Sequence, residues 1–198
     1  MPSYGLIVEG EADQRVFEHL IRKVNSPDAA VYPLSCGGVE RLMKEFPDLL
    51  RRFEYAHDSG PVDGALVIRD CDNKSALDVL EQMKKRLGNR TFRFPRGVEL
   101  CAISRKLDSW LLADENAINA VSLSRRGKRI ARVNEVIEDI AWPKEHLQRL
   151  LSEAKLNYTS VVLGEIAAEI SLKQLEYRVP SFVSFKRSVL RIYGQDLA

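Results

Sequence analysis

The side chains best suited to chemistry are acids that directly follow two short apolar runs. Glu9 follows the run 4–8, and Asp70 and Asp72 follow the run 65–68. Each run reads as a buried strand of a parallel sheet, and carboxylates at the carboxyl ends of such strands meet in the crevice where open α/β sheets bind ligands. Clustered carboxylates repel one another, so Mg²⁺ or Mn²⁺ is their natural partner. The pattern therefore predicts metal-assisted phosphoryl transfer on a nucleic acid, with these three acids as catalytic and metal-binding residues.

Structural roles are the alternative for the same acids. Glu11 and Asp13 would lie in the first turn of a helix, where negative side chains complement the helix dipole. Glu9 fits that explanation less well, because a carboxylate ending a buried strand is costly unless it is paired or metal-bound. Asp72 could cap the helix that follows it. In an extended segment, however, Asp70 and Asp72 would project to the same side and could share a cation. Asp13 is a further candidate metal ligand.

Alternating strand and helix patterns position these acids in an α/β fold. The apolar runs that predict strands are 4–8, 30–34, 65–68 and 98–103, and helical periodicity fills the connections at 12–24, 39–55 and 75–87. Short connections favour a doubly wound parallel sheet of about four strands flanked by helices. Beyond Asp114 the patterns are helical, at 143–154, 161–170 and 182–192. We expect an α/β core at 1–114 and a helical C-terminal extension, 115–198, packed on it.

Composition places the chain among ordinary globular proteins. Its 198 residues are 45% hydrophobic and 29% charged, which suffices for one well-buried core. No apolar stretch approaches the roughly 20 residues that span a bilayer, and the first residues lack the pattern of a signal peptide. Three cysteines without metal-ligand spacing favour a reducing compartment. We therefore expect a cytoplasmic protein without a membrane partner.

The formal net charge of +2 does not by itself demand a nucleic acid partner, but the charge is unevenly distributed. Five cations fall within eight residues, and four of them are candidate nucleic-acid-binding residues: Arg125, Arg126, Lys128 and Arg129. Such a cluster binds phosphates through charge-assisted contacts and counterion release. The alternative is a solvated basic loop.

The ordered pair of acidic motifs resembles the Toprim domain, the fold shared by topoisomerases, primases and overcoming-lysogenization-defect (OLD) nucleases. The resemblance rests on Leu6-Ile7-Val8-Glu9-Gly10 and on Asp70-Cys71-Asp72, and covers about residues 4–114. It implies that the strand-end glutamate and the two aspartates bind Mg²⁺. In strand-cleaving members, the residue that matches Glu9 is also a candidate general acid or base.

A narrower similarity covers nearly the whole chain. The segments 106–114, 143–145 and 180–182 are similar to a group of small prokaryotic Toprim-like proteins. That group usually has glutamates where this chain has Lys106 and Asp108. Lys106 reverses the charge at its position, whereas Asp108 keeps it. Asp108 is therefore a candidate ligand of a second metal, or alternatively an N-cap or a salt-bridge partner of Arg105. The group further implies a partner ATPase, as in split OLD-type defence nucleases.

Three function hypotheses follow. The leading one is metal-dependent hydrolysis of DNA or RNA phosphodiesters in a defence or DNA-repair system. Water is the expected nucleophile, because Tyr158, Tyr177 and Tyr193 are expected to pack in the helical region. The second is a Toprim module that binds nucleic acid or regulates an ATPase without cutting, which Lys106 favours. The third, a haloacid-dehalogenase-like phosphatase, fits poorly because its strand-end aspartates normally begin the fold. No Walker A motif predicts intrinsic ATP hydrolysis.

Overall fold

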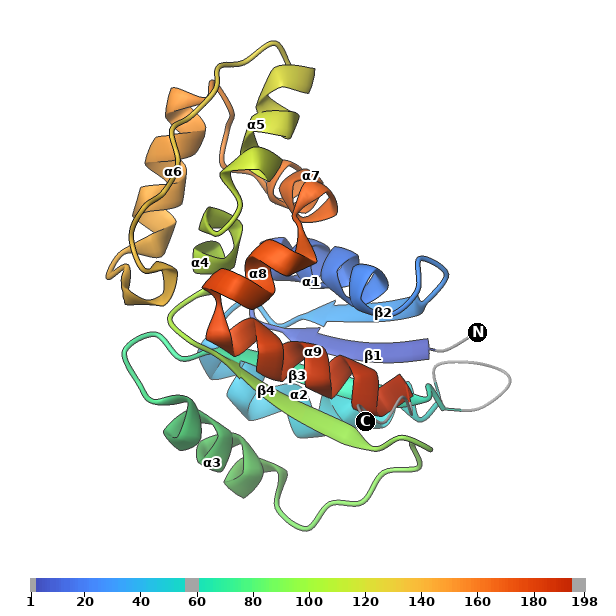
Figure 1. Cartoon of the computed structure of the whole chain (residues 1–198). Coiled ribbons are helices and arrows are strands. Elements are labelled where there is room, and N and C mark those ends of the chain that lie inside the picture. The colour runs from blue at the N-terminus through green and yellow to red at the C-terminus, as the bar shows by residue number, and fades with distance from the viewer. Residues whose placement is uncertain (1–2, 56–60, 194–198) are drawn as a thin grey trace.

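The centre of the molecule is a four-stranded parallel sheet with helices on both faces (Figure 1). The computed structural model describes residues 3–55 and 61–193. The strand order is β2-β1-β3-β4, and the strands are β1 (Ser3–Val8), β2 (Ala30–Ser35), β3 (Gly64–Asp70) and β4 (Val98–Ile103). Every pairing is parallel. The predicted α/β class with a sheet of about four parallel strands is confirmed.

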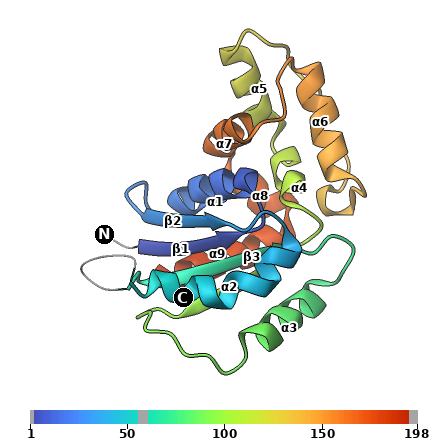
Figure 2. The same ribbon diagram turned by 180° about the vertical axis from the view of Figure 1, so that it is seen from behind.

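The two faces of the sheet carry separate apolar cores. One face is covered by α2 (Val39–Phe53), which lies in front of the sheet in Figure 2, and by α3 (Ala76–Leu87). The other face is covered by α1 (Glu11–Val24) and α9 (Pro180–Tyr193). Side chains alternate along a strand, so Leu66 and Ile68 of β3 join the second core while Val67 joins the first.

The strand order predicts a ligand position at the carboxyl end of β1, which we call the acidic crevice. From β1 the chain continues to β2 on one side and later returns to β3 on the other. Ligands in open α/β sheets bind outside the carboxyl ends of the strands at such a switch point. Because Ile7 pairs with Val67, β1 and β3 end side by side at this crevice. Glu9 and Asp70 are therefore delivered to the same edge of the sheet.

The rest of the chain is mostly helical. Its helices are α4 (Leu107–Leu112), α5 (Glu115–Ser124), α6 (Pro143–Glu153), α7 (Ser160–Glu169) and α8 (Leu172–Arg178), with a 3-10 turn at Ile137–Asp139. Helices α5, α6 and α7 lie above α1 in Figure 1. Gly164 of α7 lies close to Arg15 and His19 of α1. One apolar core runs continuously from the sheet into these helices. The proposed division at residue 114 stays a prediction.

Local structure departs from expectation in four places. Helices α5 and α8 were not expected from the pattern, and α9 begins at Pro180 rather than after it, because proline suits a first helical turn. Tyr177 is 83% exposed, so the expectation that it packs is wrong. No described helix is both long and apolar enough to cross a membrane.

Trp110 anchors the junction between the sheet and the helical region. Its ring is fully buried and makes edge contacts with Phe17 of α1 and Phe182 of α9. The indole N–H donates a hydrogen bond to Ser181 Oγ at 3.0 Å, so the polar atom of this buried ring has a partner. This cluster fixes α4, and with it Asp108, relative to the strand ends.

Candidate metal-binding acidic site

Glu9 is held at the crevice by both its backbone and its side chain. The N–H groups of Gly37 and Gly38 donate to its carbonyl oxygen at 2.8 and 2.9 Å. Both glycines have positive φ, of 80° and 129°, which lets the loop after β2 fold over β1. The Glu9 carboxylate accepts the backbone N–H of Asp70 at 3.0 Å. Burial raises the pKa of Glu9 above its ordinary value, and this hydrogen bond opposes the rise.

Asp70 has the least compensated charge in the crevice. It is the last residue of β3, and its carboxylate accepts no hydrogen bond from a described residue. Burial, followed by repulsion from Asp13 and Glu9, raises the pKa of Asp70 well above its usual range. A carboxylate without donors in this environment is costly unless it is protonated or meets a cation.

Asp72 does not lie in an extended segment, so that part of the expectation is wrong, while its role as a metal ligand stays a prediction. The chain leaves the strand at Asp70, and Asp72 has a φ of 50°, a left-handed conformation that aspartate tolerates better than most residues. The Asp72 N–H donates to the carbonyl of Arg105 at 2.9 Å, and the Asp72 carboxylate lies 3.0 Å from Lys106 Nζ. An ion pair within the protein thus holds the second aspartate of the motif.

Asp13 combines a structural role with a place in the acidic crevice. Its Oδ2 accepts the N–H of Gly10 at 2.9 Å, which closes the first turn of α1. Burial, with the charge of Asp108 adding to it, raises the pKa of Asp13 from 3.8 to about 6. The neighbouring Glu11 is exposed at the surface of α1. The helix-start explanation is confirmed for Asp13, and its role as a metal ligand stays a prediction.

Asp108 is positioned by a residue that the sequence did not single out. Tyr158 Oη donates to Asp108 Oδ1 at 2.6 Å. Burial raises the pKa of Asp108, and this hydrogen bond opposes the rise. The two structural alternatives for Asp108 are wrong, because Lys106 is the N-cap residue of α4 and Arg105 donates to Asn73 instead.

Three cationic side chains border the acids. Burial lowers the pKa of Lys106, but its hydrogen bond to Asp72 and the surrounding acids outweigh that effect and raise it. Lys144 Nζ lies 5.5 Å from the centre of the Tyr158 ring. Arg69 is 7% exposed, and its Nε lacks a partner among the described residues. No sequence pattern pointed to Tyr158 or Arg69, because their partners are distant in the chain.

The donor chemistry fits a hard divalent cation, but a complete ligand set is not assembled. Carboxylate oxygens are the ligands that Mg²⁺ and Mn²⁺ prefer, and the Asp70 carboxylate has no donor of its own among the described residues. However, no three of the described His, Cys, Asp and Glu side chains are grouped closely enough to hold one metal ion. Asp72, one of the predicted ligands, is paired with Lys106.

The basic segment after α5 lies apart from this site, beyond the helical layer at the top of Figure 1. Arg125 ends α5 and pairs with Glu165 of α7, its Nε donating at 3.0 Å. The side chains of Arg126, Lys128 and Arg129 are exposed. Their binding to nucleic acid stays a prediction.

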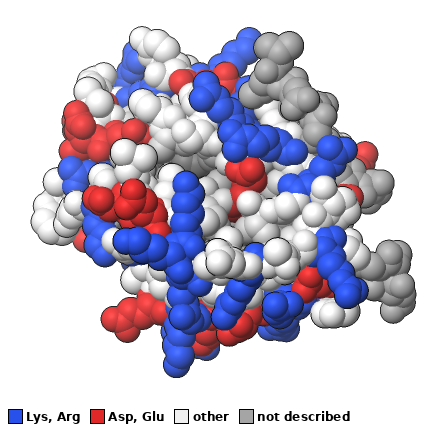
Figure 3. Space-filling model, turned by 90° about the horizontal axis from the view of Figure 1, so that it is seen from below, with Lys and Arg blue, Asp and Glu red and all other residues white. Residues whose placement is uncertain are grey.

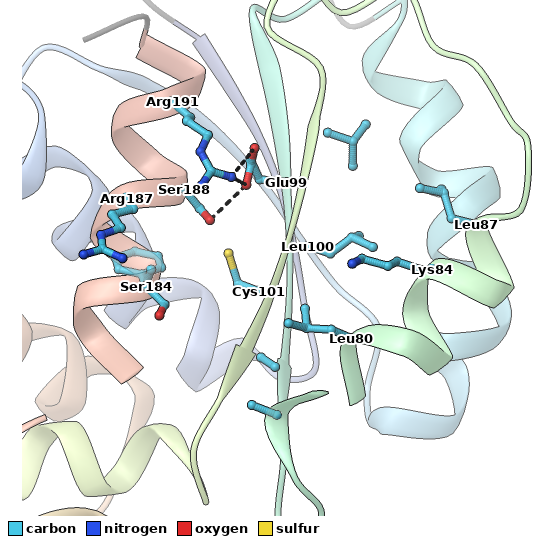
Figure 4. A pocket seen from close by; sticks show the side chains of 14 residues that line it. Leu80, Lys84, Leu87, Glu99, Leu100, Cys101, Ser184, Arg187, Ser188 and Arg191 are labelled. Atoms are coloured by element: carbon cyan, nitrogen blue, oxygen red, sulfur yellow. Dashed lines mark hydrogen bonds and ion pairs between the residues drawn. The ribbon is translucent and has the colours of Figure 1, made fainter. Parts of the chain in front are cut away.

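Away from the acids, a cavity of about 540 Å³ flanks the edge strand β4 between α3 and α9 (Figure 4). Within it the Glu99 carboxylate accepts Ser188 Oγ at 3.0 Å and pairs with Arg191 at 3.2 Å. Viewed from below, this side of the molecule carries basic and acidic side chains interspersed with uncharged ones (Figure 3). None of the acidic crevice residues lines this cavity.

Comparison with known proteins adds one structural likeness. No protein-family model matches the chain, and no curated protein matches its sequence. A solved structure, the C-terminal region of the Burkholderia pseudomallei OLD protein, is similar at a TM-score of 0.46 and 11% identity. The match covers 93% of this chain and 96% of that chain.

Proposed function

We propose that this chain is a Toprim nuclease, which hydrolyses phosphodiester bonds of DNA or RNA with the help of Mg²⁺ or Mn²⁺. The supporting observation is the crevice of Glu9, Asp13, Asp70 and Asp108, four carboxylates whose pKa values are all raised. Burial is the main cause, and mutual repulsion adds to it for Glu9, Asp13 and Asp70. Sites with several perturbed acids are candidates for metal binding and acid–base catalysis. At neutral pH a bound cation relieves the repulsion.

The side chains divide into three roles. Glu9, Asp70 and Asp72 would hold the cation, and Asp13 and Asp108 would hold a second one. A divalent cation, when bound, polarises phosphate oxygens and makes water a stronger nucleophile. Glu9 is also the candidate to hold or release a proton, because its raised pKa lies nearer neutrality than that of an ordinary glutamate.

Tyr158 orients Asp108 and does not attack the substrate. Burial, followed by the charge of Asp108, raises the pKa of its hydroxyl. The hydroxyl therefore stays protonated and keeps donating to Asp108 at 2.6 Å. This favours water over a covalent phosphotyrosine as the route of cleavage.

A non-cleaving nucleic-acid-binding or ATPase-regulating module is the second candidate, and one contact favours it. Lys106 Nζ lies 3.0 Å from the Asp72 carboxylate and neutralises the negative charge that a metal cation would otherwise balance. Replacing Lys106 with methionine frees the Asp72 carboxylate. On the nuclease proposal, this variant binds Mn²⁺ more tightly than the wild-type protein, as titration calorimetry would measure. The partner ATPase implied by the family resemblance stays a prediction.

Cleavage assays with matched variants test the proposal. The purified protein is incubated with end-labelled single- and double-stranded DNA and RNA, with Mg²⁺ or Mn²⁺ and with EDTA. Asp70→Asn should abolish metal-dependent cleavage, whereas Glu153→Gln, which changes an exposed acid paired with Arg149 on α6, should leave it unchanged. Binding of nucleic acid without cleavage of any substrate would favour the second candidate, and equal activity of Asp70→Asn would refute the proposed site.

A further inference from the structure

We propose that the cavity beside the acidic crevice binds one nucleotide of a single-stranded nucleic acid, with its base stacked on Trp142. The cavity has a volume of about 260 Å³. Its walls come from three separate segments: the loop after β3 with Asp72, the loop after β4 with Lys106, and the start of α6 with Trp142. This inference rests on the proposed function and deepens it, because it assigns a substrate subsite next to the acids.

Trp142 has the exposure expected of a stacking platform. Its side chain is 71% exposed, whereas Trp110, the other tryptophan of the chain, is fully buried. At this position only the backbone contributes to the start of α6, because the Trp142 carbonyl accepts the N–H of His146 at 3.0 Å. The Trp142 side chain makes no capping hydrogen bond. The large apolar ring is thus left facing solvent at the mouth of a cavity.

The surroundings of Trp142 suit a nucleotide. Arg105, Lys106 and Lys144 line the cavity and supply cations for a phosphate backbone. Asn73 and Glu145 supply polar groups for the edge of a base. Bases stack on aromatic side chains without strong sequence preference, because every base has a π-face.

Cavity size argues against larger occupants. Drug-sized ligands and cofactors usually need roughly 300–1,000 Å³, so a site of about 260 Å³ suits a single base and sugar better than a dinucleotide cofactor. Asp72 also belongs to the acidic motif, so a strand seated here runs directly past the candidate metal ligands.

Tryptophan fluorescence tests the subsite without requiring cleavage. Wild-type protein is titrated in EDTA with single-stranded DNA and RNA dodecamers, and both the emission and the dissociation constant are measured. Trp142 is the exposed tryptophan, so stacking should quench its emission, while Trp142→Phe should leave only the signal of buried Trp110. Trp142→Ala should weaken binding about 5- to 150-fold, as expected from a stacking free energy of about 1–3 kcal/mol per base. Trp142→Phe should keep most of the affinity.

The matched control is Tyr177→Ala, which removes another exposed aromatic ring, 83% exposed on α8. It should bind like the wild-type protein. The proposal is overturned if binding leaves the wild-type emission unchanged, if Trp142→Ala binds within twofold of wild type, or if the phenylalanine variant is as weak as the alanine variant. Quenching of the Trp142 emission without any cleavage in Mg²⁺ would support the subsite and contradict the nuclease proposal. Cleavage by Trp142→Ala with an unaltered KM would support the nuclease proposal and contradict the subsite.

Discussion

Replacing Asp13 with asparagine should stabilise the protein at pH 8 and change its stability little at pH 4. Burial, with the charge of Asp108 adding to it, raises the pKa of Asp13 from 3.8 to about 6. Between these values the native state binds the proton more tightly than the unfolded chain, so stability falls as pH rises from about 4 to about 6 and stays lower above that. At about 1.4 kcal/mol per pKa unit, ionising Asp13 in the native state costs about 3 kcal/mol.

The substitution removes this charge but keeps the local structure. The Asp13 carboxylate accepts the N–H of Gly10 at 2.9 Å, and an asparagine carbonyl can accept the same bond. Thermal denaturation in EDTA at pH 4 and pH 8 measures the effect. For a chain of this size, about 3 kcal/mol corresponds to a rise in Tm of roughly 6–12 °C. The gain at pH 4 should stay below about 1 kcal/mol, because Asp13 is then protonated in the native state.

Asp78→Asn is the matched control. Asp78 occupies the same third position of a helix, in α3, but it is exposed and accepts a hydrogen bond from Ser75. Its replacement should lower stability slightly at pH 8, because it removes an acid from a helix N-terminus. Equal gains for Asp13→Asn at pH 4 and pH 8, or no gain at pH 8, would refute the reasoning that repulsion and burial make this carboxylate unfavourable.

Two further predictions concern the same crevice, and a third concerns the loop after α5. Mg²⁺ should raise the Tm of the wild-type protein at pH 8 more than NaCl of equal ionic strength does, and Asp70→Asn should remove most of that difference; an unchanged gain would contradict a cation at Asp70. Tyr158→Phe should lower the free energy of unfolding in urea by about 1.5–3 kcal/mol, because Asp108 loses a charged hydrogen bond of 2.6 Å, and a loss below about 0.5 kcal/mol would show that this bond contributes little. Gly127→Ala should cost about 1–3 kcal/mol in the same assay, because its Cβ would collide with the carbonyl oxygen of Ala154. Wild-type stability would mean that the backbone shifts freely there.

The strand-end acids were predictable because their signal is local. A run of apolar residues specifies a buried strand, and the residue just after it must emerge at the carboxyl edge of the sheet. Glu9 and Asp70 follow that rule, and the parallel register of β1 and β3 brings them to one crevice. Asp72 shows where the rule stops. One left-handed residue after the strand turned its carboxylate toward Lys106, and no apolar pattern encodes such a turn.

The amino-acid pattern alone determined the strands, the parallel α/β class and the identity of the acids at the strand ends, because hydrophobic periodicity depends on neighbours a few residues apart. Only the tertiary structure decided which distant groups meet those acids. Tyr158 reaches Asp108 across 50 positions of the chain, and Trp142 reaches the loop of Asp72 from the start of α6. Such contacts follow from how α4 and α6 pack, and packing depends on shape complementarity across the whole core rather than on any local pattern.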